Sequence, residues 1–479
     1  MVAVLDGADV DIRYVINQLK PGGVLYYESN RLRHTNVAAS PIRIHSVLEA
    51  AGCKVQGTYV VRPSFTSAAL YLPVDAPHAL AWYVGSLYPA STLKQRLLEW
   101  GLRASTGLRT DRFATVAPFV ALVATRGASA IRLPTVLQCP EIAALMGEGP
   151  GNPIVPIMLS YGDNRILLLP LAREEREPRL IVKVPRLATF NDRNHNEQAT
   201  LREVRAMVDS SLRRSIPKPL GRATLGDISV NAESFVPGES LLRSSGMWGR
   251  SIRHKIEDLH RAGDWLCAFH EQTTTHIITW SESAYQEHVA TLLHEYQQSF
   301  GMTDQEELLF SNLQRHSQLL AGCQIPIVWQ HRDFNIWNVV RDGDEIGVID
   351  WEGGQRGLPL LDLLHFAAHW VAAVQRAVTI EARLLSFERL FLRQEPHPDR
   401  ATRAVNQVIH QYCNQLGIDR KFLPVLLVHT WLELVLRRKQ QQDDMRETRA
   451  TPRENNQYLS YIAVLAAHAN IFLDDDANR

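Results

Sequence analysis

His331-Arg-Asp-Phe-Asn-Ile-Trp-Asn338 is followed, twelve residues after Asn338, by Asp350 in Ile349-Asp350-Trp351-Glu352. The two segments form the pattern H-x-D-x-x-x-x-N, then two apolar residues and D-x-E. A lone H-x-D occurs by chance in many proteins. Four specified residues in a strand–loop–strand frame are far more restrictive, so this stretch predicts a catalytic loop rather than a solvated turn.

Phosphoryl transfer explains why these residue types would occur at this spacing. A carboxylate must accept the proton of the attacking hydroxyl, and Asp333 is the candidate. Asn338 and Asp350 carry the hard oxygen ligands that Mg²⁺ prefers. Asp350 follows the apolar strand expected at 346–349, which would hold it in place, and His331 is expected to brace the loop.

Lys183 lies in the apolar strand Leu180-Ile-Val-Lys-Val184, where its ammonium group needs a carboxylate partner and could contact α- and β-phosphates. Glu197 shares a helix face with Leu201 and Val204 and is expected to point inward as that partner. Glu203 is expected to point outward. The alternatives are an edge-strand lysine and a first-turn acid favoured by the helix dipole.

The turn Ser160-Tyr-Gly-Asp-Asn-Arg165 precedes the first strand of the same region. Its backbone N–H groups could lie near phosphates, although a plain hairpin turn is an equal alternative. At the end of the strand expected at 228–235, backbone groups could bind adenine. The candidate nucleotide-binding residues are therefore Lys183, Glu197, Ser160, Gly162, Asn164, Ser234 and Phe235.

Composition limits the remaining choices. The 479 residues predict two or three domains, and 51 basic against 51 acidic residues give no surface dedicated to nucleic acid. Five scattered cysteines without a C-x-x-C pair favour a reducing, cytoplasmic compartment. The apolar runs are too short for membrane insertion.

Gly- and Pro-rich residues 127–154 predict a linker between residues 1–126 and a sheet-bearing lobe, 155–240, with a helical lobe, 241–479, after it.

Residues 155–479 resemble the aminoglycoside phosphotransferase and choline kinase-like family, a branch of the protein-kinase-like fold, on the motifs quoted above. The resemblance implies a bilobal α+β domain that uses ATP and Mg²⁺ to phosphorylate a hydroxyl of a small molecule. It also implies structural roles for His270 and Asp362. Arg332 departs from the glycine usual in antibiotic-modifying members, which makes an aminoglycoside a poorer expectation as substrate.

Residues 1–126 resemble the later half of class I S-adenosylmethionine methyltransferases, through Leu19-Lys-Pro-Gly-Gly23 before a strand and segments 45–52 and 113–125. The glycine loop and the acid that bind the cofactor in that family would have to precede Pro21. The expected fold is thus a truncated α/β methyltransferase-like domain that does not methylate. An unrelated α/β module with a Pro-Gly-Gly turn is the alternative.

The leading hypothesis is an ATP-dependent small-molecule kinase. The alternative is a catalytically inactive pseudokinase scaffold, against which the intact Lys183, Asp333, Asn338 and Asp350 argue; a bifunctional methyltransferase-kinase is a third hypothesis. Arg437-Arg-Lys439 is interpreted as a solvated helix end rather than an anion site. The sequence specifies neither the substrate nor the oligomeric state.

Overall fold

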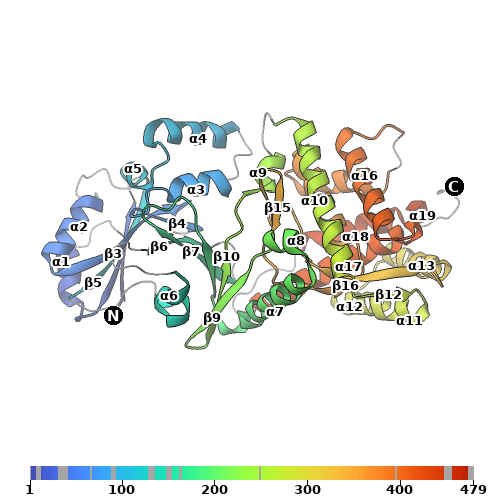
Figure 1. Cartoon of the computed structure of the whole chain (residues 1–479), viewed down its shortest axis with the longest axis horizontal. Coiled ribbons are helices and arrows are strands. Elements are labelled where there is room, and N and C mark those ends of the chain that lie inside the picture. The colour runs from blue at the N-terminus through green and yellow to red at the C-terminus, as the bar shows by residue number, and fades with distance from the viewer. Residues whose placement is uncertain are drawn as a thin grey trace. The chain divides into compact units, whose positions relative to one another are not determined.

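The computed structural model describes residues 2–6, 12–30, 41–64, 67–87, 93–127, 135–146, 154–160, 164–246, 250–393, 396–446 and 456–472 (Figure 1). The chain forms two compact units. Unit 1 comprises Met1–Tyr88, Leu93–His195 and Lys218–Phe235, and unit 2 comprises Pro89–Thr92, Asn196–Pro217 and Val236–Arg479.

Unit 1 is built on one ten-stranded sheet of order β1-β2-β5-β3-β4-β6-β7-β8-β10-β9. β1 and β2 are parallel, and every other neighbouring pair is antiparallel. The strands are β1 Val2–Asp6, β2 Val24–Asn30, β3 Cys53–Arg62, β4 Leu70–Pro73, β5 Phe119–Arg126, β6 Ile154–Leu159, β7 Arg165–Ala172, β8 Leu180–Pro185, β9 Pro219–Leu225 and β10 Ile228–Ser234.

Short helices accompany the first half of this sheet. Ile16, Leu19 and Leu48 pack against Leu25 and Leu122 in one apolar core. The helices of this unit are α1 Ile12–Gln18, α2 Pro41–Ala50, α3 Ala79–Ser86, α4 Leu93–Thr106, α5 Thr110–Ala114 and α6 Pro140–Met146.

The Pro21-Gly22-Gly23 turn before β2 has a backbone reason for its glycines. Gly22 has φ 78°, which side chains disfavour, and a Cβ on Gly23 would lie 2.9 Å from the carbonyl oxygen of Lys20. The strand expected after this turn is β2, α2 covers most of segment 45–52, and β5 covers the second half of segment 113–125. That resemblance itself stays a prediction.

The two halves of the unit 1 sheet are joined by β4 and β6, which pair through Leu70 with Leu159 and Tyr71 with Met158. The predicted linker 127–154 contains described structure: a 3₁₀ turn, Thr135–Gln138, and α6. Val136, Leu137 and Ile142 from these elements pack with Val182 in the core beneath β7–β10. A loop prediction based on Gly and Pro missed this segment because its apolar residues are buried only by distant strands.

Unit 2 is mainly helical, so the predicted sheet-bearing region followed by a helical lobe is confirmed. α7, Asn191–Met207, begins in unit 1 and continues here. The other helices are α8 Ser210–Arg214, α9 Leu241–Gly246, α10 Ile252–Thr273, α11 Glu282–Tyr285, α12 Thr291–Phe300, α13 Asp304–Leu319, α14 Leu361–Gln375, α15 Ile380–Phe391, α16 Arg400–Gln415, α17 Leu423–Arg446, α18 Gln457–Ala467 and α19 Ala469–Phe472.

Two small sheets complete unit 2. Their orders are β11-β14-β15 and β12-β13-β16. The strands are β11 Glu239–Ser240, β12 His276–Thr279, β13 Gln324–Gln330, β14 Val339–Asp342, β15 Glu345–Val348 and β16 Gln355–Gly357. Trp370 and Trp431 have no exposed surface and lie in the apolar core of unit 2.

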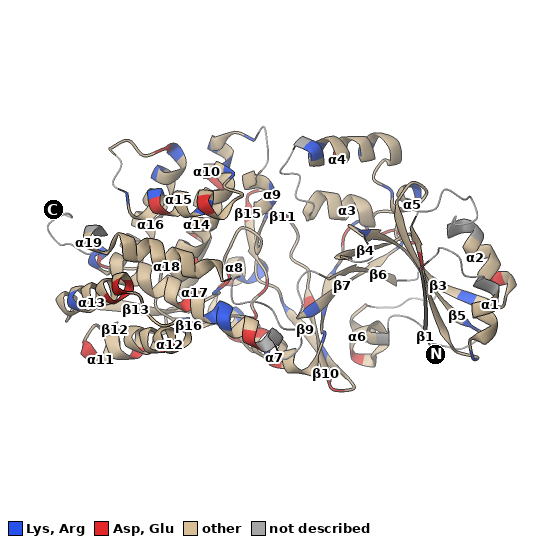
Figure 2. Cartoon of the chain, turned by 180° about the vertical axis from the view of Figure 1, so that it is seen from behind, with Lys and Arg blue, Asp and Glu red and all other residues tan. Residues whose placement is uncertain are grey.

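Basic and acidic residues are scattered over the elements of both units, as Figure 2 shows, in keeping with the balanced composition. Among the described helices, none is both long and apolar enough to cross a membrane.

Candidate active site

The β14–β15 hairpin brings the two predicted metal ligands to one place in unit 2. Val339 pairs with Val348, and the N–H of Ile349 donates to the carbonyl oxygen of Asn338 at 2.9 Å. Asn338 enters this hairpin and Asp350 leaves it, so both residues lie at the same end. The strand predicted before Asp350 is β15.

Asp333 is held by two amide side chains. Asn335 Nδ2 donates to its Oδ1 at 2.7 Å, and Asn338 Nδ2 donates to its Oδ2 at 2.9 Å. Asn335 Oδ1 in turn accepts from the N–H of Trp337 at 2.9 Å, which fixes its amide plane. Asn335 was missed in the sequence, although an Asn two residues after a candidate base is a signal for such local hydrogen bonding.

The environment of Asp333 raises its pKa to about 7. Burial is the main cause, because it penalises the charged carboxylate. The charge of Arg437 opposes the shift, whereas the nearby carboxylates of Asp350 and Glu352 add to it. A carboxylate with a pKa in this range can exchange a proton near neutral pH.

His331 braces the loop, as expected. Its Nδ1 accepts from the N–H of Asp333 at 3.2 Å, and its Nε2 lies 3.0 Å from the carbonyl oxygen of Ile349. These partners assign the proton to Nε2 in a neutral ring, and burial lowers the pKa of His331 accordingly. The ring therefore joins the loop of Asp333 to the segment that carries Asp350.

Asp362 anchors the same loop from α14. Its carboxylate accepts the N–H groups of His331 and Arg332, each at 2.7 Å, and lies 3.5 Å from His270 Nε2. His270 Nδ1 contacts the hydroxyl of Tyr412. Burial alone would raise the pKa of Asp362, but the nearby His270 and the hydrogen bonds from the loop outweigh it and hold the pKa below its usual value. Both residues are structural, as the resemblance implied.

Arg332 has φ 62°, a left-handed conformation in which glycine is favoured. This geometry explains why glycine suits the position and why an arginine there needs support. Its N–H is held by Asp362, and its guanidinium forms an ion pair with Glu433 of α17. Burial lowers the pKa of Arg332, and the charge of Glu433 opposes this shift.

In unit 1, Lys183 has a partner that the sequence analysis missed. Its Nζ lies 2.8 Å from Glu233 Oε1, and the two side chains are 4% and 3% exposed. Because Asn231 pairs directly with Lys183, Glu233 is its diagonal neighbour on β10. Glu233 is the one acidic residue of β10, and that was the available signal.

Glu197 belongs to unit 2 and is buried, as predicted. Its Oε1 accepts the N–H of Trp351, the residue after Asp350, at 3.0 Å. Glu203 is exposed and lies 3.7 Å from Arg356, which confirms its outward direction. The pairing of Lys183 with Glu197 stays a prediction.

The other nucleotide candidates lie in unit 1. The N–H of Ser160 donates to Ala69, and Asn164 accepts from the N–H of Arg186, so both ends of the turn are anchored. Gly162 lies outside the described residues. The N–H groups of Ser234 and Phe235 donate to the carbonyl oxygens of Lys218 and Arg179. Any adenine contact by these two residues therefore falls to their carbonyl oxygens.

The donor set fits a hard divalent cation bound together with nucleotide. Within the described part of the chain, no group of three or more His, Cys, Asp or Glu could hold a metal by itself. Mg²⁺ usually takes one or two protein oxygens and completes its shell with phosphates and water. Asp350 supplies a carboxylate, and Asn338, whose amide nitrogen faces Asp333, has its amide oxygen for a cation.

Residues 171–401, a little under half of the chain, match the model of a family described as the phosphotransferase enzyme family. The matched segment includes Lys183, Glu197, Asp333, Asn338 and Asp350. The chain is accordingly a small-molecule phosphotransferase, an enzyme of the kinase type. No curated protein matches the sequence.

Several solved structures are similar to this chain at low identity. An aminoglycoside 2'-phosphotransferase in complex with GDP is 13% identical, covers 68% of this chain and 96% of its own, and gives a TM-score of 0.38. A macrolide 2'-phosphotransferase from Brachybacterium faecium is 14% identical, with 69% and 98% covered and a TM-score of 0.37. A choline/ethanolamine kinase family protein from Mesorhizobium loti is 13% identical, with 68% and 98% covered and a TM-score of 0.30.

Proposed function

We propose that the protein transfers the γ-phosphate of ATP to a hydroxyl of a small molecule, with Asp333 as the catalytic base. The observation that carries this proposal is the hydrogen bonding of Asp333 to Asn338, at the end of the hairpin from which Asp350 emerges. One base and two hard oxygen ligands on a braced loop are the parts that phosphoryl transfer requires.

Each residue has a defined task in this proposal. Asp333 orients the acceptor hydroxyl and takes its proton, while Asn335 and Asn338 fix the carboxylate in one rotamer. Asn338 and Asp350 hold Mg²⁺, which when bound supplies the positive charge that offsets charge on the transferred phosphoryl group. General-base assistance is typically worth about 10²–10⁴-fold, so alignment and charge must provide most of the acceleration.

The nucleotide assignments extend the proposal. Lys183 contacts the α- and β-phosphates, with Glu197 as its carboxylate partner, and Ser160, Gly162 and Asn164 cover them. The buried Glu233 supports Lys183 by keeping a charged ammonium stable in an apolar sheet. Backbone carbonyls at Ser234 and Phe235 face the adenine.

We also propose that the enzyme works in the cytoplasm, without nucleic acid. All five cysteines are free, which supports a reducing compartment. For residues 1–126 we propose a methyltransferase-like sheet. The parallel β1–β2 pair and the turn before β2 support that assignment.

Asp350→Ala tests the proposal most directly. We expect the variant to lose turnover and the Mg²⁺-dependent part of nucleotide binding, measured by ADP release and by thermal shift with ATP, with and without Mg²⁺. Asp344→Ala, at an exposed acid in the turn of the same hairpin, is the matched control. An unchanged rate in Asp350→Ala would refute the assignment, and absence of any Mg²⁺-dependent shift in the wild type would favour the scaffold alternative.

A further inference from the structure

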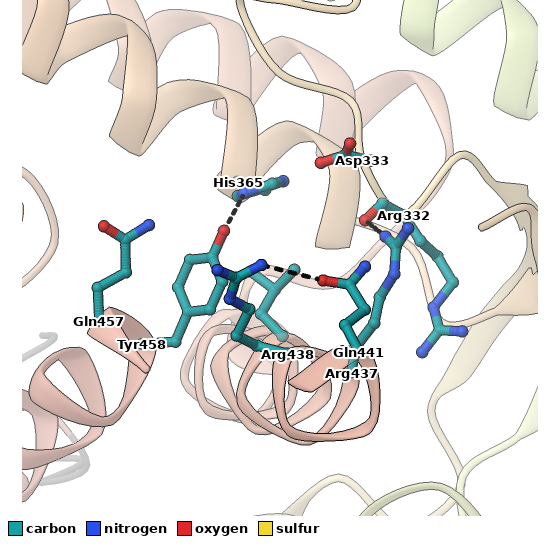
Figure 3. Close-up of a pocket in the computed structure, with 9 residues that line it drawn as sticks. Arg332, Asp333, His365, Arg437, Arg438, Gln441, Gln457 and Tyr458 are labelled. Atoms are coloured by element: carbon teal, nitrogen blue, oxygen red, sulfur yellow. Dashed lines mark hydrogen bonds between the residues drawn. The ribbon is translucent and has the colours of Figure 1, made fainter. Parts of the chain in front are cut away.

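A cavity of about 450 Å³ lies beside Asp333 within unit 2 (Figure 3). The catalytic loop and α14 line one side, and α17 and α18 line the other. This volume is in the range that holds a small organic ligand. The polar side chains that matter for its chemistry are Asp333, Arg437, Arg438, Gln441, Gln457 and Tyr458.

α17 extends beyond the predicted end of this helix. It continues to Arg446, so Arg437-Arg-Lys439 lies inside the helix beside the active site, and the interpretation as a solvated helix end was wrong. Good helix formers after Lys439, mainly glutamines, explain the extension. Arg437 and Arg438 consequently face the cavity, while Lys439 does not line it.

The two arginines differ from their neighbour Arg332 in how their charge is balanced. Arg332 is paired with Glu433. Arg437 donates to the carbonyl oxygen of Arg332 and packs on Gly353, where a Cβ would lie 2.4 Å from its Nη2. Arg438 reaches the neutral side chain of Gln441 at 3.4 Å. Among the described residues, neither Arg437 nor Arg438 has a carboxylate partner.

The charge of Arg437 acts on the pKa values of two other residues that line the cavity. It opposes the rise in the pKa of Asp333, and it adds to the effect of burial in lowering the pKa of His365. His365 is thus neutral and contacts the hydroxyl of Tyr458, as Figure 3 shows. Asp333 is the one carboxylate among the described residues that line this cavity.

A second cavity, of about 490 Å³, shows that the excess positive charge is local. It also borders α17, but its lining combines three bases with the acids Glu295, Glu433 and Asp443. Lys439, one of those bases, pairs with Asp443. The first cavity sets one carboxylate, Asp333, against Arg332, Arg437 and Arg438, so basic residues are in excess and it favours an anion over a cation.

We propose that the cavity beside Asp333 binds the acceptor, and that the acceptor is an anionic hydroxyl compound whose carboxylate or phosphate is held by Arg438. This inference rests on the proposed kinase function. The hydroxyl oxygen bonds to the γ-phosphorus, the bond from that phosphorus to the bridging oxygen of ATP breaks, and the hydroxyl proton passes to Asp333, which gives ADP and a phosphate monoester. A polycationic amino sugar is excluded by the same charge.

Matched acceptors test the inference by binding. Gluconate, glucose 6-phosphate, sorbitol and glucosamine are titrated calorimetrically into the wild type, Arg438→Gln and Lys439→Gln. We expect at least one of the two anions to bind, with about tenfold or more weaker binding in Arg438→Gln and unchanged binding in Lys439→Gln, because charge-assisted bonds to a carboxylate or phosphate are lost only in the former. Comparing gluconate with glucose 6-phosphate separates the two anionic groups.

Binding of sorbitol or glucosamine in preference to both anions would overturn the inference, as would failure of both anions to bind or equal anion affinity in the three proteins. ADP release with the same compounds separates this outcome from failure of the kinase proposal. Turnover that depends on Asp350 but prefers neutral acceptors refutes the anionic site alone. Loss of all Mg²⁺-dependent nucleotide binding refutes the kinase function.

Discussion

Asp362→Ala removes the acceptor that fixes the catalytic loop, and its consequences can be worked out from two contacts. The fully buried carboxylate accepts the N–H groups of His331 and Arg332, each at 2.7 Å. With alanine in its place, both N–H donors stay buried and have no carboxylate to accept their hydrogen bonds. A buried donor left unsatisfied costs about 1–3 kcal/mol, so the variant should lose about 2–6 kcal/mol of unfolding free energy.

The loss should depend on pH. The pKa of Asp362 is held below its usual value of 3.8, so its contribution is present above that value and disappears as pH falls through the folded-state pKa. The difference between wild type and variant should therefore be full at neutral pH and shrink in acid. Turnover should also fall by about 10²-fold, because Asp333 follows His331 and Arg332 in the loop that Asp362 anchors and would lose its fixed position.

Urea unfolding followed by tryptophan fluorescence, with ADP-release kinetics, measures both effects. Glu203→Ala is the matched control, because it removes an exposed acid 3.7 Å from Arg356 and should change stability by less than about 1 kcal/mol. If Asp362→Ala were as stable as that control and retained wild-type turnover, the anchoring role would be refuted.

Three further variants address other contacts. Asp333→Asn should keep near-normal ATP affinity while losing at least about 10²-fold in turnover; equal loss of affinity and turnover would make Asp333 a metal or structural residue. Glu233→Gln should lower unfolding free energy by up to about 3–5 kcal/mol, since Lys183 loses a buried charged partner 2.8 Å away, and a denaturation midpoint like that of the wild type would contradict this. His429 is buried with a pKa lowered from 6.5 to about 4, so it is neutral in the fold while the unfolded chain takes up a proton below about 6.5. The free energy of unfolding should therefore decrease as the pH is lowered from about 6.5 to 4. His429→Phe should reduce this decrease by up to about 3 kcal/mol in unfolding titrations, and a pH profile identical to that of the wild type would exclude His429 as a cause.

Much of the site could be predicted because its residues are close together in the chain. Asp333, Asn338 and Asp350 belong to one loop and one hairpin, and short-range hydrogen bonds bring them together. Strand and helix periodicity likewise indicated β7, β8 and α7, and the burial of Glu197 followed from its helix face.

Residues far apart in the chain were harder to place. The sequence indicated that Lys183 needs a carboxylate, but the diagonal register of β8 and β10 made Glu233 a neighbour. The pairing of β4 with β6 that makes one sheet of ten strands carries no local signature either. Such contacts depend on which surfaces are buried together, which periodicity along a single segment does not encode.

The sequence by itself indicated the chemistry proposed for this protein: a candidate base, two candidate oxygen ligands and a strand lysine, in an order typical of phosphoryl transfer. Only the tertiary structure decided the surroundings of that chemistry. It placed Asp362 beneath the loop and turned Arg437 and Arg438 toward a cavity instead of solvent. Local propensity sets what a segment can form, but packing sets which charges lie beside Asp333, and the proposed preference for an anionic acceptor rests on that balance.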